Sequence, residues 1–256
     1  MALATQFRWK SASRSHVGLV REINEDTCLD QPGRGLWAVA DGMGGHAAGD
    51  VASHMVIETL SKVSPASSLV NFVADARARL QAVNQQLRAE AAIRNVQIIG
   101  STVVVLLACD RYCAYLWAGD SRIYLYRNGR LRQLTRDHSR VEELKSSGQL
   151  TPEDAIHHPA HKIITRAVGA VDTLNLDEDI VEVNDGDIFL LCSDGLTNDV
   201  SEREIADALI RGNCRRASDA LVEMALKRGG RDNISVVVVH SEDLYGSDKT
   251  ILNPAL

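Results

Sequence analysis

The chain of 256 residues is poor in the features that mark disulfide-rich, fibrous and membrane proteins. Its five cysteines are scattered without a C-x-x-C pair, which excludes a disulfide framework and a zinc knuckle. Its five prolines and 18 dispersed glycines form no linker or repeat. The longest apolar run, residues 103–109, is far shorter than the ~20 residues of a membrane-spanning helix. We therefore expect a single cytoplasmic domain without a membrane span or signal peptide.

A basic excess is also missing, because 28 Lys and Arg residues face 34 Asp and Glu residues, for a formal net charge of −6. Aromatic residues make up only 4% of the chain. A general polynucleotide-binding groove combines positive charge with stacking aromatics, so nucleic acid is not expected as a partner. The hydrophobic content of 45%, in contrast, is that of an ordinary globular protein with a buried core.

Runs rich in Val, Leu and aromatic residues predict strands. These runs cover residues 36–40, 102–108, 113–118, 123–126, 188–192 and 235–240, with turns predicted at 109–112 and 127–130. Helical spacing of apolar residues covers 51–63, 69–87 and 220–227, and Ser201 and Glu204 form a capping box before another helix. This order predicts an α+β fold in which helices cover β-sheets in a layered sandwich, followed by a tail over 241–256.

Four aspartates stand at the ends of predicted strands. Asp41, Asp120 and Asp194 each follow an apolar run, and Asp232 precedes one. Because the end of one antiparallel strand lies beside the start of the next, the four can meet at one edge of the sheets. Such a cluster resists ionisation unless a cation neutralises it, and an all-oxygen ligand set favours Mg²⁺ or Mn²⁺. One Asp-Gly after a strand is usually a simple turn, but four acids beside Gly or Asn favour a metal site.

The N-terminal segment places an arginine beside two acids, Arg21, Glu25 and Asp26. The planar guanidinium of Arg21 suits a phosphate, and the two carboxylates could orient metal-bound water. Taken alone, the segment is explained more simply as a solvated strand edge with a surface ion pair.

Seven motifs occur in one order between residues 18 and 239. They are Arg21-x-x-Asn24-Glu25-Asp26, Ala40-Asp41-Gly42-Met43-Gly44-Gly45, Gly100-Ser101-Thr102, Gly119-Asp120-Ser121-Arg122, Thr135-x-Asp137-His138-Ser139, Ser193-Asp194-Gly195-Leu196 and Asp232-Asn233. Together they resemble the metal-dependent protein phosphatase family (PPM, type 2C), in its bacterial serine/threonine phosphatase branch. The resemblance implies an α/β/β/α sandwich of two antiparallel sheets, with a catalytic domain over residues 1–240 and a flap subdomain at about 139–169.

The resemblance also implies the reaction and its cofactors. Phosphoserine and phosphothreonine in proteins would be hydrolysed by water activated by two tightly bound Mn²⁺ or Mg²⁺ ions. Asp41 would bridge the two ions, the carbonyl of Gly42 would bind one, and Asp194 and Asp232 would hold the other. Asp120, together with Asp194, matches the place of a weaker third ion.

The remaining roles concern phosphate and protons. Arg21 matches the family's phosphate-binding arginine, and Glu25 would act mainly through metal-bound water. Met43 stands where eukaryotic members carry a His proposed as general acid, so the acid that protonates the leaving group is left open. His46 is interpreted as a surface residue at a helix start and His138 as a structural residue.

Several other interpretations stay open from the residues alone. Cys28 and Arg34 have the C-x₅-R spacing of cysteine-dependent phosphatases, although their loop leads into a predicted strand rather than a helix. A metal-poor relative could bind phosphoproteins as a regulatory module, and a two-metal nuclease would use similar carboxylates. The flap histidines, His157, His158 and His161, suggest zinc, but no acid or cysteine completes a ligand set, which favours a solvated, weakly basic flap.

Partners follow only by analogy with the family. They are phosphorylated proteins, a serine/threonine kinase whose action the phosphatase opposes, and a protein with a forkhead-associated domain as a shared target. The chain itself is expected to be a monomer.

Overall fold

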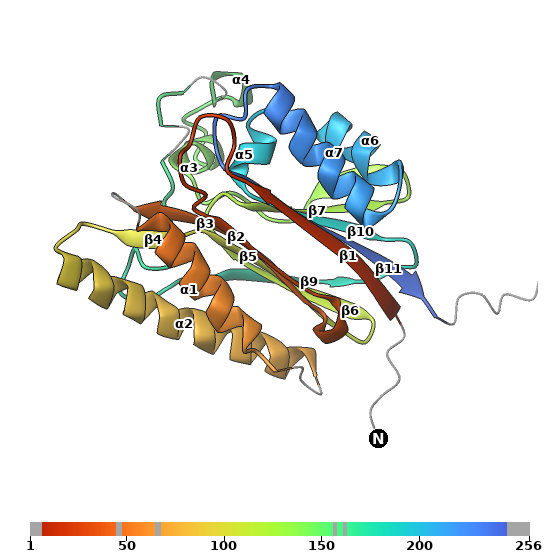
Figure 1. Cartoon of the computed structure of the whole chain (residues 1–256), viewed down its shortest axis with the longest axis horizontal. Coiled ribbons are helices and arrows are strands. Elements are labelled where there is room, and N and C mark those ends of the chain that lie inside the picture. The colour runs from red at the N-terminus through yellow and green to blue at the C-terminus, as the bar shows by residue number, and fades with distance from the viewer. Residues whose placement is uncertain (1–6, 45–47, 65–67, 156–157, 161–162, 245–256) are drawn as a thin grey trace, which may run out of the picture.

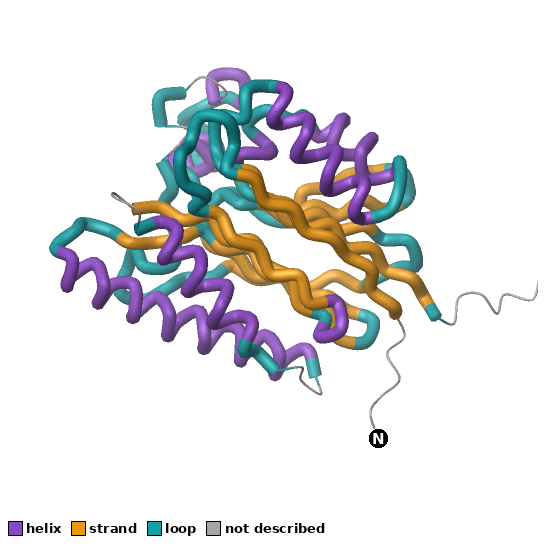
Figure 2. Tube along the Cα trace, in the orientation of Figure 1, coloured by secondary structure: helices purple, strands orange, loops and turns teal. Residues whose placement is uncertain are grey.

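The computed structural model describes residues 7–44, 48–64, 68–155, 158–160 and 163–244. Two antiparallel sheets are stacked face to face, and helices cover the outer face of each (Figures 1 and 2). The fold is therefore the α/β/β/α sandwich of the α+β class that the sequence predicts.

One sheet has the strand order β1-β11-β10-β7-β8. Its strands are β1 (Phe7–His16), β7 (Arg122–Arg127), β8 (Arg130–Gln133), β10 (Ile188–Cys192) and β11 (Ile234–Asp243). The turn predicted between β7 and β8 is present, with positive φ at Asn128 (50°) and Gly129 (77°), as a tight hairpin requires. β11 runs through residues 241–243, which the sequence assigned to the tail, and residues 245–256 lie outside the described part of the chain.

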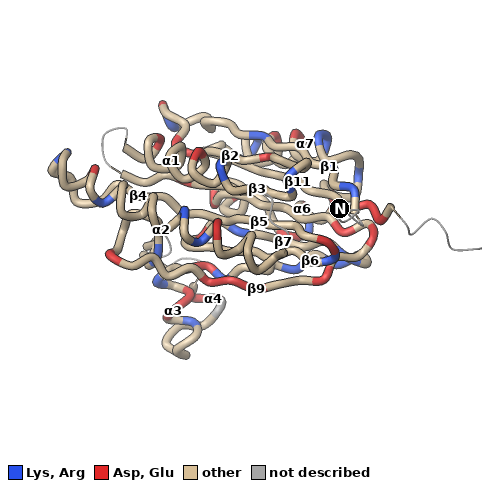
Figure 3. Tube along the Cα trace, turned by 90° about the horizontal axis from the view of Figure 1, so that it is seen from below, with Lys and Arg blue, Asp and Glu red and all other residues tan. Residues whose placement is uncertain are grey.

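The other sheet has the order β2-β3-β5-β6-β9, with β4 paired to β3. Its strands are β2 (Asp26–Gln31), β3 (Leu36–Gly44), β4 (Ile99–Ser101), β5 (Val103–Cys109), β6 (Tyr112–Ala118) and β9 (Asp177–Glu182). β9 escaped prediction because its sequence, Asp-Glu-Asp-Ile-Val-Glu, is acidic and mostly exposed. Its acidic residues line the edge of the sheet in Figure 3, where charge discourages pairing with another strand.

Two groups of helices cover the sandwich. α1 (Gly49–Ser61) and α2 (Leu69–Arg94) pack on the six-stranded sheet, and α5 (Asp194–Thr197), α6 (Glu202–Ile210) and α7 (Cys214–Lys227) pack on the five-stranded sheet (Figure 1). α6 begins with the predicted capping box, in which the backbone N–H of Ser201 donates to Glu204 (3.1 Å). The short helices α3 (Arg140–Ser146) and α4 (Pro152–Ala155) fall in the expected flap, and η1 (Pro32–Arg34) links β2 to β3. None of the described helices is long and apolar enough to cross a membrane.

Three apolar layers hold these elements together. Trp37 and Phe189 are fully buried between the two sheets, Leu60 of α1 and Leu80 of α2 pack on the six-stranded sheet, and Leu221 of α7 packs on the five-stranded sheet. Each such side chain contributes roughly 1.5–3 kcal/mol to stability through burial. The layers therefore fix the strands, and the strand ends carry the candidate functional residues.

Candidate active site

A pocket of about 310 Å³ lies where β3 and β10 end and β11 begins. It is lined by Arg21, Glu25, Asp41, Gly42, Met43, Gly44, Asp120, Ile164, Asp194, Asp232 and Asn233. The four strand-end aspartates thus meet in one place, together with Arg21, Glu25 and Gly42. Asp26 is instead buried on β2, opposite Asp41 on β3, with only 4% of its surface exposed.

Asp41 is held through its backbone inside β3, which runs on to Gly44 instead of ending at residue 40 as the sequence predicts. The N–H of Thr102 donates to the Asp41 carbonyl (2.8 Å), and the Asp41 N–H donates to the hydroxyl of Thr102 (3.1 Å). At Gly42, a Cβ would lie 1.9 Å from the carbonyl oxygen of Gly49. Only glycine therefore allows the start of α1 to approach the end of β3, and the Asp-Gly pair is more than a turn.

The second Asp-Gly pair is held in a similar way. The N–H of Ser193 donates to the carbonyl of Ser235 (3.0 Å), which joins the end of β10 to the start of β11. At Gly195, a Cβ would lie 2.0 Å from the carbonyl oxygen of Asn233. This close approach brings Asp194 and Asp232, which are far apart in the sequence, to the same pocket.

The carboxylates repel one another. Desolvation raises the pKa of Asp41 well above its usual value, and Asp26 and Asp194 raise it further. Desolvation and Asp194 likewise raise the pKa of Asp120 to about 7. The Oδ1 atoms of Asp26 and Asp120 are buried without a hydrogen-bond partner among the described residues. A hard divalent cation stabilises such a cluster, because it neutralises the desolvated carboxylates and binds the oxygens that lack hydrogen bonds.

These donors fit a metal ion only with help from other ligands. Within the described ranges, no group of three or more His, Cys, Asp or Glu side chains is placed to hold an ion. Asp232, in addition, is engaged by Arg21, in two contacts of 3.0 Å from Nη2 and Nε to the carboxylate oxygens. The carbonyl of Gly42 and water molecules would therefore complete the coordination.

The ion pair of Arg21 differs from the one that the sequence suggests. The local alternative was a pair with Glu25 or Asp26, but the partner is Asp232, 211 residues further along the chain. Half of the Arg21 side chain is still exposed. The guanidinium therefore lies at the pocket within reach of an incoming anion.

The carboxylate of Glu25 is held in place by the start of α1. Its carboxylate accepts a hydrogen bond from the backbone of Gly49, the first residue of α1. Desolvation raises the pKa of Glu25, and this hydrogen bond and Arg21 lower it. Glu25 thus presents an oriented oxygen to the pocket at a helix N-terminus, where negative charge is favoured.

Asn233 is a site residue whose role the sequence does not reveal. Its Nδ2 donates to the carbonyls of Val17 (2.8 Å) and Ile23 (3.0 Å), and its Oδ1 accepts from the N–H of Glu25 (2.8 Å). Three hydrogen bonds from one side chain therefore hold both ends of the loop that carries Arg21. The motif Asp232-Asn233 was the only signal, and it did not identify the loop as the partner.

The cysteine-dependent interpretation is wrong. Cys28 lies within strand β2, where desolvation raises the pKa of its thiol to about 12, the opposite of what a thiolate nucleophile needs. Arg34 donates to the carbonyl of Ser61 (2.8 Å), and the loop enters strand β3 instead of opening a helix. These two residues thus form no phosphate cradle.

His138 holds the turn before Asp120. Its ring stacks on Trp117 (centroids 6.0 Å apart), and its Nδ1 faces the N–H of Gly119 at 3.2 Å. Desolvation lowers the pKa of His138, although its contact with Asp177 opposes the shift. This environment agrees with the structural interpretation. His46, His157 and His161 lie outside the described residues.

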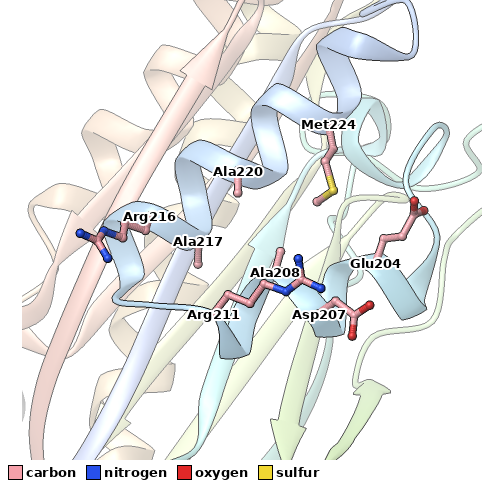
Figure 4. A pocket seen from close by; sticks show the side chains of 8 residues that line it. All are labelled: Glu204, Asp207, Ala208, Arg211, Arg216, Ala217, Ala220 and Met224. Atoms are coloured by element: carbon pink, nitrogen blue, oxygen red, sulfur yellow. The ribbon is translucent and has the colours of Figure 1, made fainter.

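A larger pocket, of about 410 Å³, lies between α6 and α7 (Figure 4). Its lining combines two acids, Glu204 and Asp207, with two arginines and three alanines, and Glu204 is bound by Arg228 and Ser201. Its chemistry is therefore that of a surface groove between helices, whereas the smaller pocket concentrates carboxylates of one sign.

The chain is similar to known proteins over most of its length. The family model described as Protein phosphatase 2C matches residues 12–228. A Mycobacterium tuberculosis relative named serine/threonine protein phosphatase PstP is 38% identical over 250 residues, covering 96% of this chain and 48% of the relative. The chain thus spans about half the length of that curated relative.

Solved structures are similar over almost the whole chain. A Pseudomonas aeruginosa structure described as PppA, a key regulatory component of T6SS, has a TM-score of 0.86 and 45% identity, covering 91% of this chain and 97% of that one. The catalytic domain of PstP in complex with two manganese ions has a TM-score of 0.84 and 36% identity, covering 93% of this chain and 100% of that one.

Proposed function

The chain belongs to the protein phosphatase 2C family, and on that basis we propose that it is a metal-dependent phosphatase that hydrolyses phosphoserine and phosphothreonine in proteins. The observation that carries the proposal is the pocket in which Asp41, Asp120, Asp194 and Asp232 converge beside Arg21. Phosphoryl transfer needs charge neutralisation and positioning more than covalent chemistry, and this pocket is built for both.

We assign Mn²⁺ or Mg²⁺ to the oxygen donors of this pocket. Asp41, the carbonyl of Gly42, Asp194 and Asp232 would hold two ions, and Asp120 with Asp194 would hold a weaker third. Supporting evidence is the raised pKa of Asp41 and the unpartnered buried oxygen of Asp120. Bound there, divalent ions supply Lewis-acid activation of water and neutralise phosphoryl charge.

The protein's own groups bind and orient the substrate. Arg21 offers two N–H groups to phosphoryl oxygens. In the structure, the same two groups contact both carboxylate oxygens of Asp232. Glu25, held by Gly49, orients water at the other side of the pocket. Met43 also lines the pocket, but its thioether carries no proton, so the leaving alkoxide takes its proton from another source.

The test is hydrolysis of a phosphothreonine peptide in the presence of Mn²⁺, measured as released phosphate. A single-stranded oligonucleotide serves as the comparison substrate for nuclease chemistry. We expect rapid phosphate release from the peptide and an intact oligonucleotide. Tight binding of the peptide without hydrolysis would favour the metal-poor binding module, and cleavage of the oligonucleotide would favour a nuclease.

The physiological setting belongs to the same proposal. We infer that the enzyme is a cytoplasmic monomer that opposes a serine/threonine kinase, with a forkhead-associated-domain protein as a shared substrate. The basis is that several relatives are bacterial serine/threonine phosphatases, whose reaction reverses that of a serine/threonine kinase. Light scattering of the purified chain tests the monomer, and phosphoproteomics after deletion of its gene tests the kinase opposition.

Arg21→Ala is expected to raise KM for a phosphopeptide by roughly one to two orders of magnitude, because charge-assisted hydrogen bonds contribute about 1.5–3 kcal/mol. Arg21→Lys keeps the charge but loses the planar guanidinium that binds two oxygens at once, so its KM should lie between those of the wild type and Arg21→Ala. Steady-state kinetics at saturating Mn²⁺ measure the effect.

Metal binding should respond to Arg21→Ala in the opposite direction. Because Arg21 pairs with Asp232, its removal frees an oxygen ligand and should tighten Mn²⁺ binding in a calorimetric titration. Weaker Mn²⁺ binding with an unchanged KM would mean that Arg21 supports the metal site and not the phosphate.

Asn233→Asp keeps the shape of the side chain but removes both N–H donors to the loop of Arg21. Each lost hydrogen bond costs about 1 kcal/mol, and the new charge faces two carbonyl oxygens. We expect a lower melting temperature and a KM raised about tenfold as Arg21 becomes less well placed.

Asn84→Asp is the matched control. Asn84 is also buried, donates to the carbonyl of Val171 (2.9 Å) and accepts from the N–H of Gly169 (2.6 Å), but it lies on α2. It should lower the melting temperature without the rise in KM. Equal KM effects in both variants would mean that Asn233 acts through global stability alone.

A further inference from the structure

The loop that carries Arg21 exposes three large apolar side chains. Leu19, Val20 and Ile23, between β1 and β2, have exposed fractions of 65%, 66% and 46%. Single exposed apolar residues are ordinary on protein surfaces, but a concentration of them in one short loop indicates a contact surface. We call these three residues the apolar rim.

The apolar rim stands on a firmly held backbone. The N–H of Leu19 donates to the carbonyl of Gly230 (2.7 Å), and Asn233 binds the carbonyl of Ile23 (3.0 Å). Gly18, with φ of 87°, packs so closely on the 230–232 segment that a Cβ would lie 2.3 Å from the Asp232 carbonyl oxygen. A surface fixed before binding loses little entropy when it is covered, which favours recognition.

A second apolar segment borders the same pocket. Ile164 lines the pocket, and its neighbour Ile163 is 53% exposed. This segment is tied to the start of α3, because the N–H of Arg140 donates to the carbonyl of Ile163 (2.9 Å). Ile163 and Ile164 therefore add apolar surface at the pocket, whose lining on the side of the loop is Arg21 and Glu25.

We propose that the apolar rim binds apolar side chains that flank the phosphorylated residue of the protein substrate. This inference rests on the proposed function, in which Arg21 holds the phosphate. Successive Cα atoms are ~3.8 Å apart, and an extended peptide advances ~3.3 Å per residue. All three rim residues lie within two positions of Arg21 in the sequence. A substrate side chain within two residues of the phosphothreonine is therefore close enough to contact them.

The charges of the loop support an apolar rather than an electrostatic selectivity. Arg21 and Glu22 stand in the middle of the apolar rim with opposite signs. With Arg21 engaged by phosphate, the flanking surface consists of a leucine, a valine and an isoleucine, with the exposed Glu22 as the one remaining charge among them. The preferred substrate is therefore a phosphothreonine segment with Leu, Ile, Val or Met beside the phosphorylated residue.

The experiment compares two phosphothreonine peptides of equal length and charge, one with leucine and one with serine at the positions flanking phosphothreonine. Val20→Thr replaces a methyl group by a hydroxyl at nearly the same shape. Val70→Thr is the matched control, because Val70 is 75% exposed at the start of α2. Hydrolysis of p-nitrophenyl phosphate, which has no flanking residues, serves as the reference reaction.

We expect the wild type to favour the leucine peptide about tenfold in kcat/KM, mainly through KM, which is within the range that one apolar contact contributes. Val20→Thr should reduce this preference about threefold, and Val70→Thr should leave it intact. Equal use of both peptides by the wild type, or an equal loss with p-nitrophenyl phosphate in Val20→Thr, would overturn the apolar rim while leaving the phosphatase function standing. If neither peptide nor p-nitrophenyl phosphate is hydrolysed, the proposed function itself is overturned.

Discussion

Asp41→Asn is expected to lower kcat/KM for a phosphopeptide by about 10²–10³-fold, the range seen when a central electrostatic group of an active site is removed. The amide has the shape of the carboxylate but lacks its charge, and Asp41 lies at the centre of the carboxylate cluster. Calorimetric titration with Mn²⁺ should show the loss of a tight site.

The same substitution should raise the melting temperature of the metal-free protein. A carboxylate whose pKa is raised in the folded state opposes folding whenever it is ionised, and a neutral amide removes that opposition. For a chain of this size, each kcal/mol of relieved repulsion corresponds to about 2–4 °C. Opposite effects on activity and on stability distinguish a metal ligand from a residue that merely supports the fold.

Two further variants define the limits of this prediction. Asp194→Asn should behave like Asp41→Asn, because Asp194 shares the pocket and raises the pKa of Asp41. Asp120→Asn should reduce turnover mainly at low Mn²⁺ concentrations and spare the tight sites, as expected of a ligand to a weaker third ion. Loss of the same tight site in all three variants would contradict the distinction between Asp120 and the others.

Exhaustive chelation is expected to abolish phosphopeptide hydrolysis, and added Mn²⁺ or Mg²⁺ should restore it. Without a cation, water stays a weak nucleophile with a pKa near 15.7, and the carboxylates of the pocket repel the phosphate. Metal binding should also be visible without turnover, as a melting temperature that rises with Mn²⁺ concentration. The stabilisation should reach about 2.7 kcal/mol at a free Mn²⁺ concentration 100 times the dissociation constant.

Cys28→Ser is the control for this experiment. Its thiol is desolvated with a pKa raised to about 12, so the variant should keep both its activity and its dependence on metal. Activity that survives chelation in the wild type and disappears in Cys28→Ser would show that a covalent thiol mechanism operates after all.

The parts of the fold that the sequence predicts are those with local signals. β10 was predicted with its observed bounds, because Ile188–Cys192 is a purely apolar segment between turns. The capping box at Ser201 is likewise readable from residues three positions apart. β1 and β9 are half exposed and polar, and they become strands only through pairing with β11 and β6, so no local pattern reveals them.

The sequence by itself indicated which aspartates meet in the pocket, because three that follow apolar runs and one that precedes a run carry the signal in their own order. Only the tertiary structure decided which groups meet. It paired Arg21 with Asp232, placed Asn233 where it binds the loop of Arg21, and left Val20, the neighbour of Arg21 in that loop, exposed. The physical reason is that residue type and local spacing set what a side chain can do, whereas a hydrogen bond across 211 residues depends on how the layers pack.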